Sequence, residues 1–446
     1  MKARTSLALF LSPTDDERVV LRAPQYKGPG TQERFLQRGE FLMWYAGIDW
    51  ADQHHDALVI DEKGHQVGSI RVNHSPEGVA KLNAFLEQIV GSGGREQIAC
   101  IIETTHGLLI AALPEAGWPV YPVNPRTVDR RRSASGAKTD IIDAYLLAKT
   151  GRADFADLRR LTPESEQVAE LKALTRDQDA LIQMQTRLVN QLTACLKAYY
   201  PVALQFFSKL QQRVSLIFLQ TYPTPQAAMA ASLEQVTSVL KQASHPHPTQ
   251  VAHKIFETLR QPVLQADEVS TRTKSRLMLA LVKQLLPLLE EIASYDEEIA
   301  RLFLIHEDND VFSSLPRAGR RLAPGLLAEI GDDRSRYADA ASVQALAGTS
   351  PVLFQSGMYS KAHRRLGCIK PLRNALHQFA WQSTQSEPWA RDYYQRKRAE
   401  GKSHTVAVRA LANVWARIIF ALWFNRTCYQ TAIFEQAQRQ HAPRAA

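Results

Sequence analysis

The order of short apolar segments between Trp44 and Lys149 constrains the fold of this chain more than any other feature of its sequence. Three segments follow one another with only turn residues between them, at 45–49, 57–60 and 66–72. Two further apolar runs, at 98–102 and 119–123, alternate with segments of helical periodicity at 78–90, 107–116 and 139–149. Apolar runs of this length, bounded by turn residues, are typical of strands. We therefore predict an α/β domain over 44–155 that begins with an antiparallel meander.

The middle of the chain has a helical pattern. From Glu164, leucines at helical spacing predict one long amphipathic helix that Pro201 stops. Later, apolar residues alternate at spacings of four and three, which indicates a coiled-coil seam with a kink at Pro287: Leu281, Leu285, Leu288, Ile292, Tyr295, Ile299 and Leu302. We predict a helical segment over 156–310, with an insert of unassigned role at 201–262. Its two long helices form an antiparallel hairpin or a dimerising stalk.

Residues 311–426 are predicted to form a mostly α-helical domain. A turn-helix-turn pattern over 315–332, punctuated by Gly319, Gly325 and Gly331, resembles a helix-hairpin-helix, a common element for binding the DNA backbone. Residues 351–366 lack periodic apolar positions and are predicted to be a loop, whereas 370–382 and 405–423 are predicted helices. We expect 1–43 to be a loose extension, with Met43 as an alternative start, and 427–446 to be a tail.

Composition narrows the class of protein. Lys and Arg outnumber Asp and Glu by 54 to 45, and the formal net charge of +9 favours a polyanionic partner such as DNA or RNA. The four cysteines are far apart and form no zinc-binding or disulfide pattern. No apolar run reaches the ~18 residues of a membrane span, and no signal peptide opens the chain. We expect a cytoplasmic protein with no membrane partner.

Four carboxylates lie where two predicted strands and one predicted helix can bring them together. Asp49 and Glu103 each end an apolar strand, and Asp140 and Asp143 are three apart on one helix face. Close carboxylates repel one another unless cations compensate, and Mg²⁺ prefers such an all-oxygen site. The quartet is therefore our candidate metal site for phosphoryl transfer. The structural alternative is that Asp140 caps its helix and Asp49 is a turn residue.

Two basic segments are candidate nucleic-acid-binding sites. One lies directly before the helix at 139–149 and contains Arg126, Arg130, Arg131, Arg132 and Lys138. The other follows Ser356 and contains Lys361, His363, Arg364, Arg365, Lys370 and Arg373. A serine hydroxyl beside such cations can attack a phosphodiester, so Ser356 is the candidate nucleophile, with Ser335, Ser350 and Ser360 as rivals. The alternatives are an exposed basic loop and an ordinary Ser-Gly turn.

Two further groups of residues are expected to be structural. His54, His55 and Asp56 are adjacent on a predicted strand, where successive side chains point to opposite faces. We therefore expect exposed polar residues there and no metal site. Aromatic side chains can stack on bases, but on helices most belong to a core. We expect this for most of the C-terminal ones, which are Trp381, Trp389, Tyr393, Tyr394, Trp415 and Trp423.

Taken together, these motifs resemble a known family. They are Tyr-Ala-Gly-Ile-Asp ending at Asp49, Ile-Glu-Thr-Thr around Glu103, Val-Asn-Pro around Asn124 and Gly-Ala-Lys-Thr-Asp-Ile-Ile-Asp ending at Asp143. All are similar to motifs of the DEDD transposases of insertion sequences, which are relatives of the Piv-type invertases. The family's N-terminal domain is ribonuclease-H-like, of the RuvC type, and its element order is the one predicted above. The stretch from Leu315 through Gln-Ser-Gly at Ser356 resembles the family's second domain.

The resemblance implies a DNA recombinase guided by a bridge RNA. It implies that the quartet binds Mg²⁺ and that Ser356 attacks the DNA backbone, forming a covalent phosphoserine link. A dimer or tetramer would act on donor and target DNA in a bacterial cytoplasm, in association with the nucleoid. Many members follow the Ser-Gly with a Gly-Lys-rich segment, whereas here the basic run is displaced to Arg364 and Arg365. Two alternatives stay open: a RuvC-like structure-selective nuclease that uses metal-activated water, and a non-catalytic nucleic-acid-binding protein.

Overall fold

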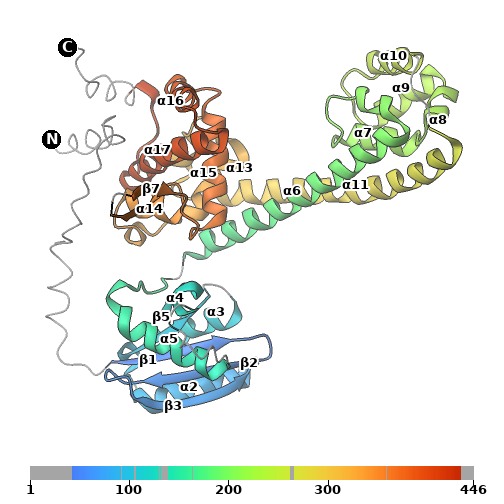
Figure 1. The fold of residues 1–446 in the computed structure, drawn as a ribbon. Helices are drawn as coiled ribbons and strands as arrows, with labels where there is room; N and C mark the ends of the chain where they lie inside the picture. Colours follow the sequence, from blue (N-terminus) through green and yellow to red (C-terminus); the bar gives the residue numbers. More distant parts are fainter. Residues whose placement is uncertain are drawn as a thin grey trace, which may run out of the picture. The chain divides into compact units, whose positions relative to one another are not determined.

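The computed structural model of the chain describes residues 43–432, except 92, 105–106, 130, 132–138, 163, 262–265, 358 and the side chain of Arg126. The described chain divides between residues 163 and 164 into two compact units (Figure 1). The N-terminal unit is a mixed α/β domain, and the C-terminal unit is almost wholly helical. The predicted succession of an α/β domain and a helical region is confirmed.

A five-stranded sheet organises the N-terminal unit. Its strands are β1 Trp44–Trp50, β2 His54–Ile60, β3 Gln66–Asn73, β4 Ile98–Ile102 and β5 Val120–Pro122, in the spatial order β3-β2-β1-β4-β5. The first three strands pair antiparallel, whereas β4 is parallel to both β1 and β5. The predicted antiparallel meander is confirmed, and β1 becomes the central strand.

Helices cover both faces of this sheet. On one face α2 Pro76–Val90 and α3 Leu108–Glu115 enclose a core, and on the other α4 Pro125–Asp129 and α5 Asp140–Asp154 enclose a second one. Because successive strand residues point to opposite faces, β4 contributes buried side chains to both cores. Cys100 and Ile102 face the α2 side, whereas Ala99 and Ile101 face the α5 side. Short 3₁₀ turns at Arg95–Gln97 and Phe155–Asp157 precede β4 and follow α5.

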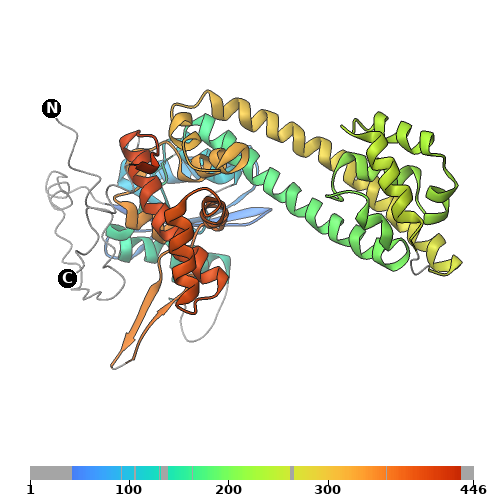
Figure 2. The same cartoon turned by 90° about the horizontal axis from the view of Figure 1, so that it is seen from above.

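The C-terminal unit begins with a long helical hairpin. Helices α6 Glu166–Tyr199 and α11 Glu268–Leu304 lie side by side along most of their length (Figures 1 and 2). Helix α6 starts at the N-cap Ser165 and stops before Pro201, as predicted. Pro287 lies inside the uninterrupted α11. Six of the seven predicted seam residues are buried, and Tyr295 is half-buried. The seam is thus covered within one chain, in an antiparallel hairpin.

The insert forms a helical cap at the far end of this hairpin (Figure 1). It contains a 3₁₀ turn at Pro201–Gln205 and helices α7 Arg213–Thr221, α8 Pro225–Ala230, α9 Leu233–Gln242 and α10 Pro248–Leu259. Its apolar faces bury Phe206, Phe218 and Ile255 against the ends of α6 and α11. The cap therefore has its own core.

The C-terminal domain gathers around one buried helix, α17 His404–Asn425. The other elements are α12 Asn309–Ser313, α13 Gly319–Ile330, a 3₁₀ turn at Arg334–Arg336, α14 Ala340–Leu346, β6 Val352–Ser356, β7 Tyr359–His363, α15 Lys370–Ser383 and α16 Pro388–Ala399. Among the described helices, α17 alone is long and apolar enough to suit a membrane span. It packs Trp415, Ile419 and Trp423 into the core, as the central helix of a helical domain does.

One prediction for this domain is wrong. The sequence pattern predicts a loop over 351–366, but these residues contain the antiparallel hairpin of β6 and β7, which extends away from the helices (Figure 2). The turn uses Gly357 at φ +56°, a left-handed conformation that glycine adopts without strain. Nearly every hairpin residue is exposed. Without a buried face there is no alternation of apolar and polar residues, which is the pattern that identifies a strand.

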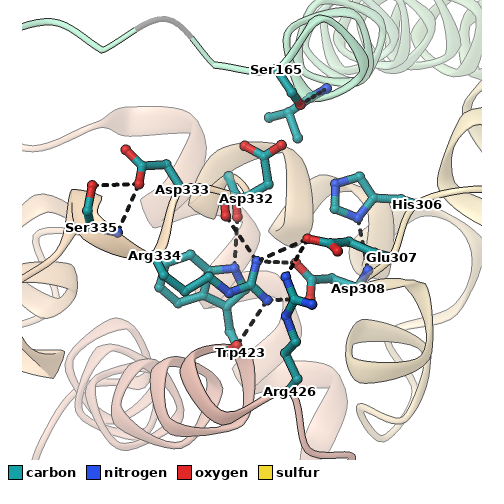
Figure 3. Close-up of polar contacts among 12 residues, drawn as sticks. Ser165, His306, Glu307, Asp308, Asp332, Asp333, Arg334, Ser335, Trp423 and Arg426 are labelled. Carbon is teal, nitrogen blue, oxygen red and sulfur yellow. Dashed lines mark hydrogen bonds and ion pairs between the residues drawn. The ribbon is translucent and has the colours of Figure 1, made fainter.

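A buried ion pair ties the start of the C-terminal domain to its end (Figure 3). Asp308 is completely buried and accepts two hydrogen bonds from the Arg334 guanidinium, with Nη1 to Oδ2 at 2.7 Å. The same guanidinium donates to the carbonyl oxygen of Trp423 at 3.1 Å and lies over its ring at 4.8 Å. Since a buried charge is costly unless paired, this cluster fixes how α17 ends against the α12 segment.

Candidate active site and nucleic-acid-binding surfaces

Two residues of the predicted quartet lie at one edge of the sheet. Strands β1 and β4 are parallel neighbours, and Ile48 pairs with Ile102. Asp49 and Glu103, the next residue of each chain segment, therefore follow at the same edge. On the other side of β1, Asp49 is paired with Asp56 of β2. Three carboxylates thus come from adjacent segments of the sheet.

The other two quartet residues occupy the first turn of α5. Thr139 is the N-cap, and its Oγ1 accepts a hydrogen bond from the backbone nitrogen of Ile142. Asp140 is therefore not the cap, and its carboxylate is available for another role. The helix crosses β1 at Gly47, where a Cβ atom would lie only 1.9 Å from the carbonyl oxygen of Ala144. This glycine lets the helix backbone approach the strand two residues before Asp49.

The pKa of Asp49 reflects both its burial and the carboxylates around it. Burial raises its pKa from 3.8 to about 6, and the negative charges of Asp143, Asp140, Glu103 and Asp56 contribute to this rise in that order of size. The other three quartet residues and Asp56 therefore all act on Asp49. Such crowding disfavours ionisation of every member unless cations compensate.

Arg71 and His54 border this carboxylate cluster; the sequence pattern did not identify Arg71 and placed His54 among exposed polar residues. Arg71 of β3 donates to Asp56 Oδ2 at 2.8 Å and to Asp140 Oδ2 at 2.9 Å. His54 Nε2 lies 3.2 Å from the same Asp140 oxygen. The hydrogen bond to His54 and the positive charge of Arg71 hold the Asp140 pKa below its usual value. Arg71 is the cross-strand partner of Asp56, so the register of β2 and β3 would have revealed it.

The expectation for the His54-His55-Asp56 segment is wrong for two of its residues. His55 and Asp56 are only 1% and 4% exposed. The prediction assumed a strand with one solvated face, whereas both faces of β2 are covered. His55 Nε2 lies 2.9 Å from His74 Nδ1. Ligand atoms of His54, Asp56 and Asp140 all lie within 4.8 Å of one another, a donor set that suits a divalent cation.

The first basic segment is only partly described. Arg130, Arg132, Lys138 and the side chain of Arg126 lie outside the described residues. Arg131 is described, and its Nη2 donates to both carboxylate oxygens of Asp154 at 2.6 Å. This ion pair attaches the segment after α4 to the end of α5. The guanidinium of Arg131 is thus already engaged within the domain.

Ser356 is the last residue of β6, at the tip of the exposed hairpin. It pairs with Tyr359, and Phe354 pairs with Lys361, so these side chains share one face with His363. On that face, Tyr359 Oη lies 3.4 Å from His363 Nε2, and the rings of Phe354 and His363 are 4.8 Å apart. The candidate nucleophile is therefore accessible and has a phenol, an imidazole and an ammonium group on its own side of the hairpin.

The rival serines have different surroundings. Ser335 Oγ donates to Asp333 Oδ1 at 2.6 Å in the 3₁₀ turn after α13. Ser360 lies on the opposite face of the hairpin and accepts a hydrogen bond from Gln355 at 3.2 Å. Ser350 precedes β6, and its backbone nitrogen donates to the Gln344 carbonyl. Of these serines, Ser356 alone shares a hairpin face with Tyr359, Lys361 and His363.

The C-terminal aromatic residues are mostly core, as expected. Trp389, Trp415 and Trp423 are buried, and Tyr393 and Tyr394 are half-buried against the same core. Trp381 is the exception, because 39% of its surface is exposed.

A mixed sheet whose edge gathers acidic side chains, followed by a helical domain with a basic hairpin, describes a class of nucleic-acid-processing proteins. Comparison with known proteins specifies the family. Residues 46–201 match the DEDD transposase family of IS110 elements, and residues 309–395 match the family described as "Transposase IS116/IS110/IS902 family".

Individual relatives match over nearly their whole length. The "Mini-circle putative transposase for IS117" of Streptomyces coelicolor is 32% identical over 90% of this chain and 97% of its own length. The IS116 insertion-element protein of Streptomyces clavuligerus is 30% identical over 87% of this chain and 96% of its own. The IS900 protein of Mycobacterium paratuberculosis is 27% identical over 87% of this chain and 97% of its own length. The chain belongs to the IS116/IS110/IS902 family of insertion-sequence transposases, which implies cutting and rejoining of DNA and use of a divalent metal.

Proposed function

We propose that this transposase cuts and rejoins DNA through the hydroxyl group of Ser356, with a covalent phosphoserine intermediate and a metal held by Asp49, Glu103, Asp140 and Asp143. The observation that carries the proposal is the crowding of these carboxylates, which contributes to raising the Asp49 pKa to about 6. Carboxylates that repel one another do not help the sheet to pack, whereas a divalent cation needs several carboxylate ligands in one place. The strand order β3-β2-β1-β4-β5 supports a RuvC-like, ribonuclease-H-like assignment for the domain.

Mg²⁺ is the metal we propose, because it prefers carboxylate oxygens and keeps open positions for phosphate. Asp49 from β1, Glu103 after β4, and Asp140 and Asp143 from α5 supply the ligands. When bound, Mg²⁺ neutralises charge that develops on the reacting phosphate. Arg71 and His54 hold the Asp140 side chain through hydrogen bonds, and such outer contacts orient metal ligands.

The serine step moves one phosphoryl group. The Ser356 Oγ–P bond forms, the bond between phosphorus and one deoxyribose oxygen breaks, and that oxygen leaves as a hydroxyl group. The Ser356 proton passes through a water molecule to the Tyr359–His363 pair on the same hairpin face, and that pair or solvent supplies the proton of the leaving oxygen. Lys361 lies on the same face and counters the charge of the phosphate. Rejoining is the reverse attack by a DNA hydroxyl group, after which Ser356 regains its proton.

The remaining partners are proposals based on the family. We propose that a bridge RNA selects donor and target DNA, and that two or four copies act together on the two DNA sites. The net charge of +9 supports a polyanionic partner. DNA flanking the gene should then contain a non-coding stretch with a foldable RNA. Adding that transcript to purified protein should activate strand exchange, and activity without any RNA would contradict guidance.

The serine mechanism is tested with matched hairpin variants. Ser356→Ala should abolish strand exchange and leave no protein–DNA adduct, because no hydroxyl is present to attack. Ser360→Ala, on the opposite face of the same hairpin, should retain activity. DNA cleavage that persists in Ser356→Ala would contradict the serine step. It would favour a RuvC-like nuclease with metal-activated water, for which the carboxylate cluster alone is sufficient. DNA chemistry unchanged in Asp140→Asn would indicate a non-catalytic binding protein.

A further inference from the structure

Two segments of the C-terminal domain lack acidic residues altogether. Residues 340–386 and 401–434 contain no Asp or Glu, although the whole chain has 45. They contain nine cations: Lys361, Arg364, Arg365, Lys370, Arg373, Lys402, Arg409, Arg417 and Arg426. The first segment includes α15 and the second includes α17, and these two helices pack against each other. Apart from Arg426, which pairs with Glu307 from outside these segments, the positive charges of α15 and α17 therefore meet in the fold with no carboxylate of their own segments beside them.

Three arginines of these segments surround one histidine. Arg373 and His377 are four residues apart on α15, and so share a face. Arg409 comes from α17, and Arg364 directly follows β7. Burial and then the positive charges of Arg373, Arg409 and Arg364 lower the His377 pKa to about 4. Burial and the charge of Arg364 also lower the Arg409 pKa. The guanidinium groups of Arg364 and Arg409 are therefore close enough to repel each other.

This cluster has no counter-charge in the part of the chain that the structure describes. None of its arginines forms an ion pair there, and Arg373 donates only to the neutral Asn374 Oδ1 and Cys368 Sγ. The Nε2 atom of His377 is buried without a hydrogen-bond partner. Arginine forks normally bind carboxylates or phosphates. Three of them around a neutral imidazole form an unfavourable arrangement, which a bound anion would relieve.

An aromatic platform lies farther along α15. Trp381 follows His377 by four residues, and 39% of the surface of this residue is exposed. Its ring packs edge-on to Tyr394 of α16 at 5.4 Å and to His404 of α17 at 4.9 Å. Tyr394 Oη lies 2.8 Å from His404 Nδ1. Three helices therefore hold this exposed indole in a fixed position.

We propose that Arg364, Arg373 and Arg409 bind a backbone phosphate of a DNA single strand, and that Trp381 stacks on a base of the same strand. Positive side chains beside an exposed aromatic ring are the usual features of single-strand binding sites. The eight residues from Arg373 to Trp381 rise ~12 Å along the helix, or about three to four steps at the ~3.4 Å spacing of a stacked strand. A paired base could not offer its face to Trp381, which favours an unpaired strand.

DNA is the assigned ligand because the family acts on DNA. The inference does not depend on Ser356, and binding is measured without catalysis. Arg409 was absent from the sequence-based candidates, since it lies in no basic run. Only the packing of α17 against α15 brings it near His377.

The test is fluorescence anisotropy of full-length protein with a labelled oligothymidine of about 12 nucleotides, in EDTA. Arg409→Gln should weaken binding roughly tenfold and reduce the slope of log K against log salt by about 0.7, because one phosphate contact is lost. Arg396→Gln removes the same charge from an exposed site on α16, over Tyr393. It should change affinity less than about twofold and leave the salt slope unchanged.

Variants of Trp381 test the proposed base stacking separately. Trp381→Ala should weaken binding by about tenfold with an unchanged salt slope, since stacking releases no counterions, and Trp381→Phe should recover most of the loss. If Arg409→Gln fails to fold by circular dichroism, the exposed Arg364→Gln replaces it with the same expectation. An Arg409 or Arg364 variant that behaves like Arg396→Gln overturns the phosphate site. Tighter binding of oligouridine than of oligothymidine overturns the assignment to DNA.

Discussion

Replacing Asp49 with asparagine should stabilise the metal-free protein while removing its activity. The asparagine side chain would keep the shape of the aspartate but carry no charge, so it would not repel Asp143, Asp140, Glu103 and Asp56. A gain in stability from changing an active-site residue is the result expected where carboxylates are gathered for a cation.

The magnitude follows from the pKa of Asp49, which rises from 3.8 to about 6 in the folded chain. At ~1.4 kcal/mol per unit, this corresponds to about 3 kcal/mol against folding when Asp49 is ionised. Because the side chain is only half-buried, solvent screening reduces the effect to about 1–2 kcal/mol. The folded pKa is the higher one, so the cost is fully present above pH 6 and disappears as the pH falls toward 4.

Hydrogen exchange followed by mass spectrometry is the appropriate assay, because the two units of the chain need not unfold together. Peptides covering β1 and β4 should gain about 1–2 kcal/mol of protection in Asp49→Asn at pH 7.5 in EDTA, and little at pH 4.5. Added Mg²⁺ should protect wild type more than the variant. Asp52→Asn, at an exposed position just after β1, should match wild type. Lower protection in Asp49→Asn at pH 7.5 would refute the crowding of the carboxylates.

Three further variants test other parts of the account. Gly47→Ala should impair activity and lower the free energy of unfolding, measured by chemical denaturation, by about 2 kcal/mol or more, since the added methyl group meets the α5 backbone. An unchanged free energy of unfolding would contradict that close packing. Arg334→Ala should lower unfolding free energy by about 3–5 kcal/mol, because Asp308 is left buried and unpaired; a loss below about 1 kcal/mol would show that water reaches it. Tyr359→Phe should slow single-turnover adduct formation roughly tenfold or more with unchanged DNA affinity, and an unchanged rate would exclude the proton path.

The sequence predicted the sheet and the quartet because both depend on local patterns. Strands with two buried faces form continuous apolar runs, and a carboxylate such as Asp49 or Glu103 at the end of such a run is conspicuous. The spacing of Asp140 and Asp143 fixed their common helix face. The spacing could not predict the role of Gly47, because that role depends on where α5 crosses β1.

Residues whose role depends on strand register or helix packing were missed. Arg71 becomes part of the acidic site only through its cross-strand position opposite Asp56. Arg409 comes near His377 only because α17 packs against α15. The hairpin at Ser356 was missed for a different reason: it has no buried face, so its sequence lacks the alternation that burial imposes.

The most direct test of the central claim is to map the covalent link. Wild-type protein is incubated with Mg²⁺, DNA and the transcript of the flanking non-coding region, quenched in denaturant, and digested with protease and nuclease. Mass spectrometry should find a deoxynucleotide attached to the peptide containing Ser356, and no adduct in Asp49→Asn or Ser356→Ala. Cleaved DNA with no adduct, or an adduct on another residue, would contradict the account.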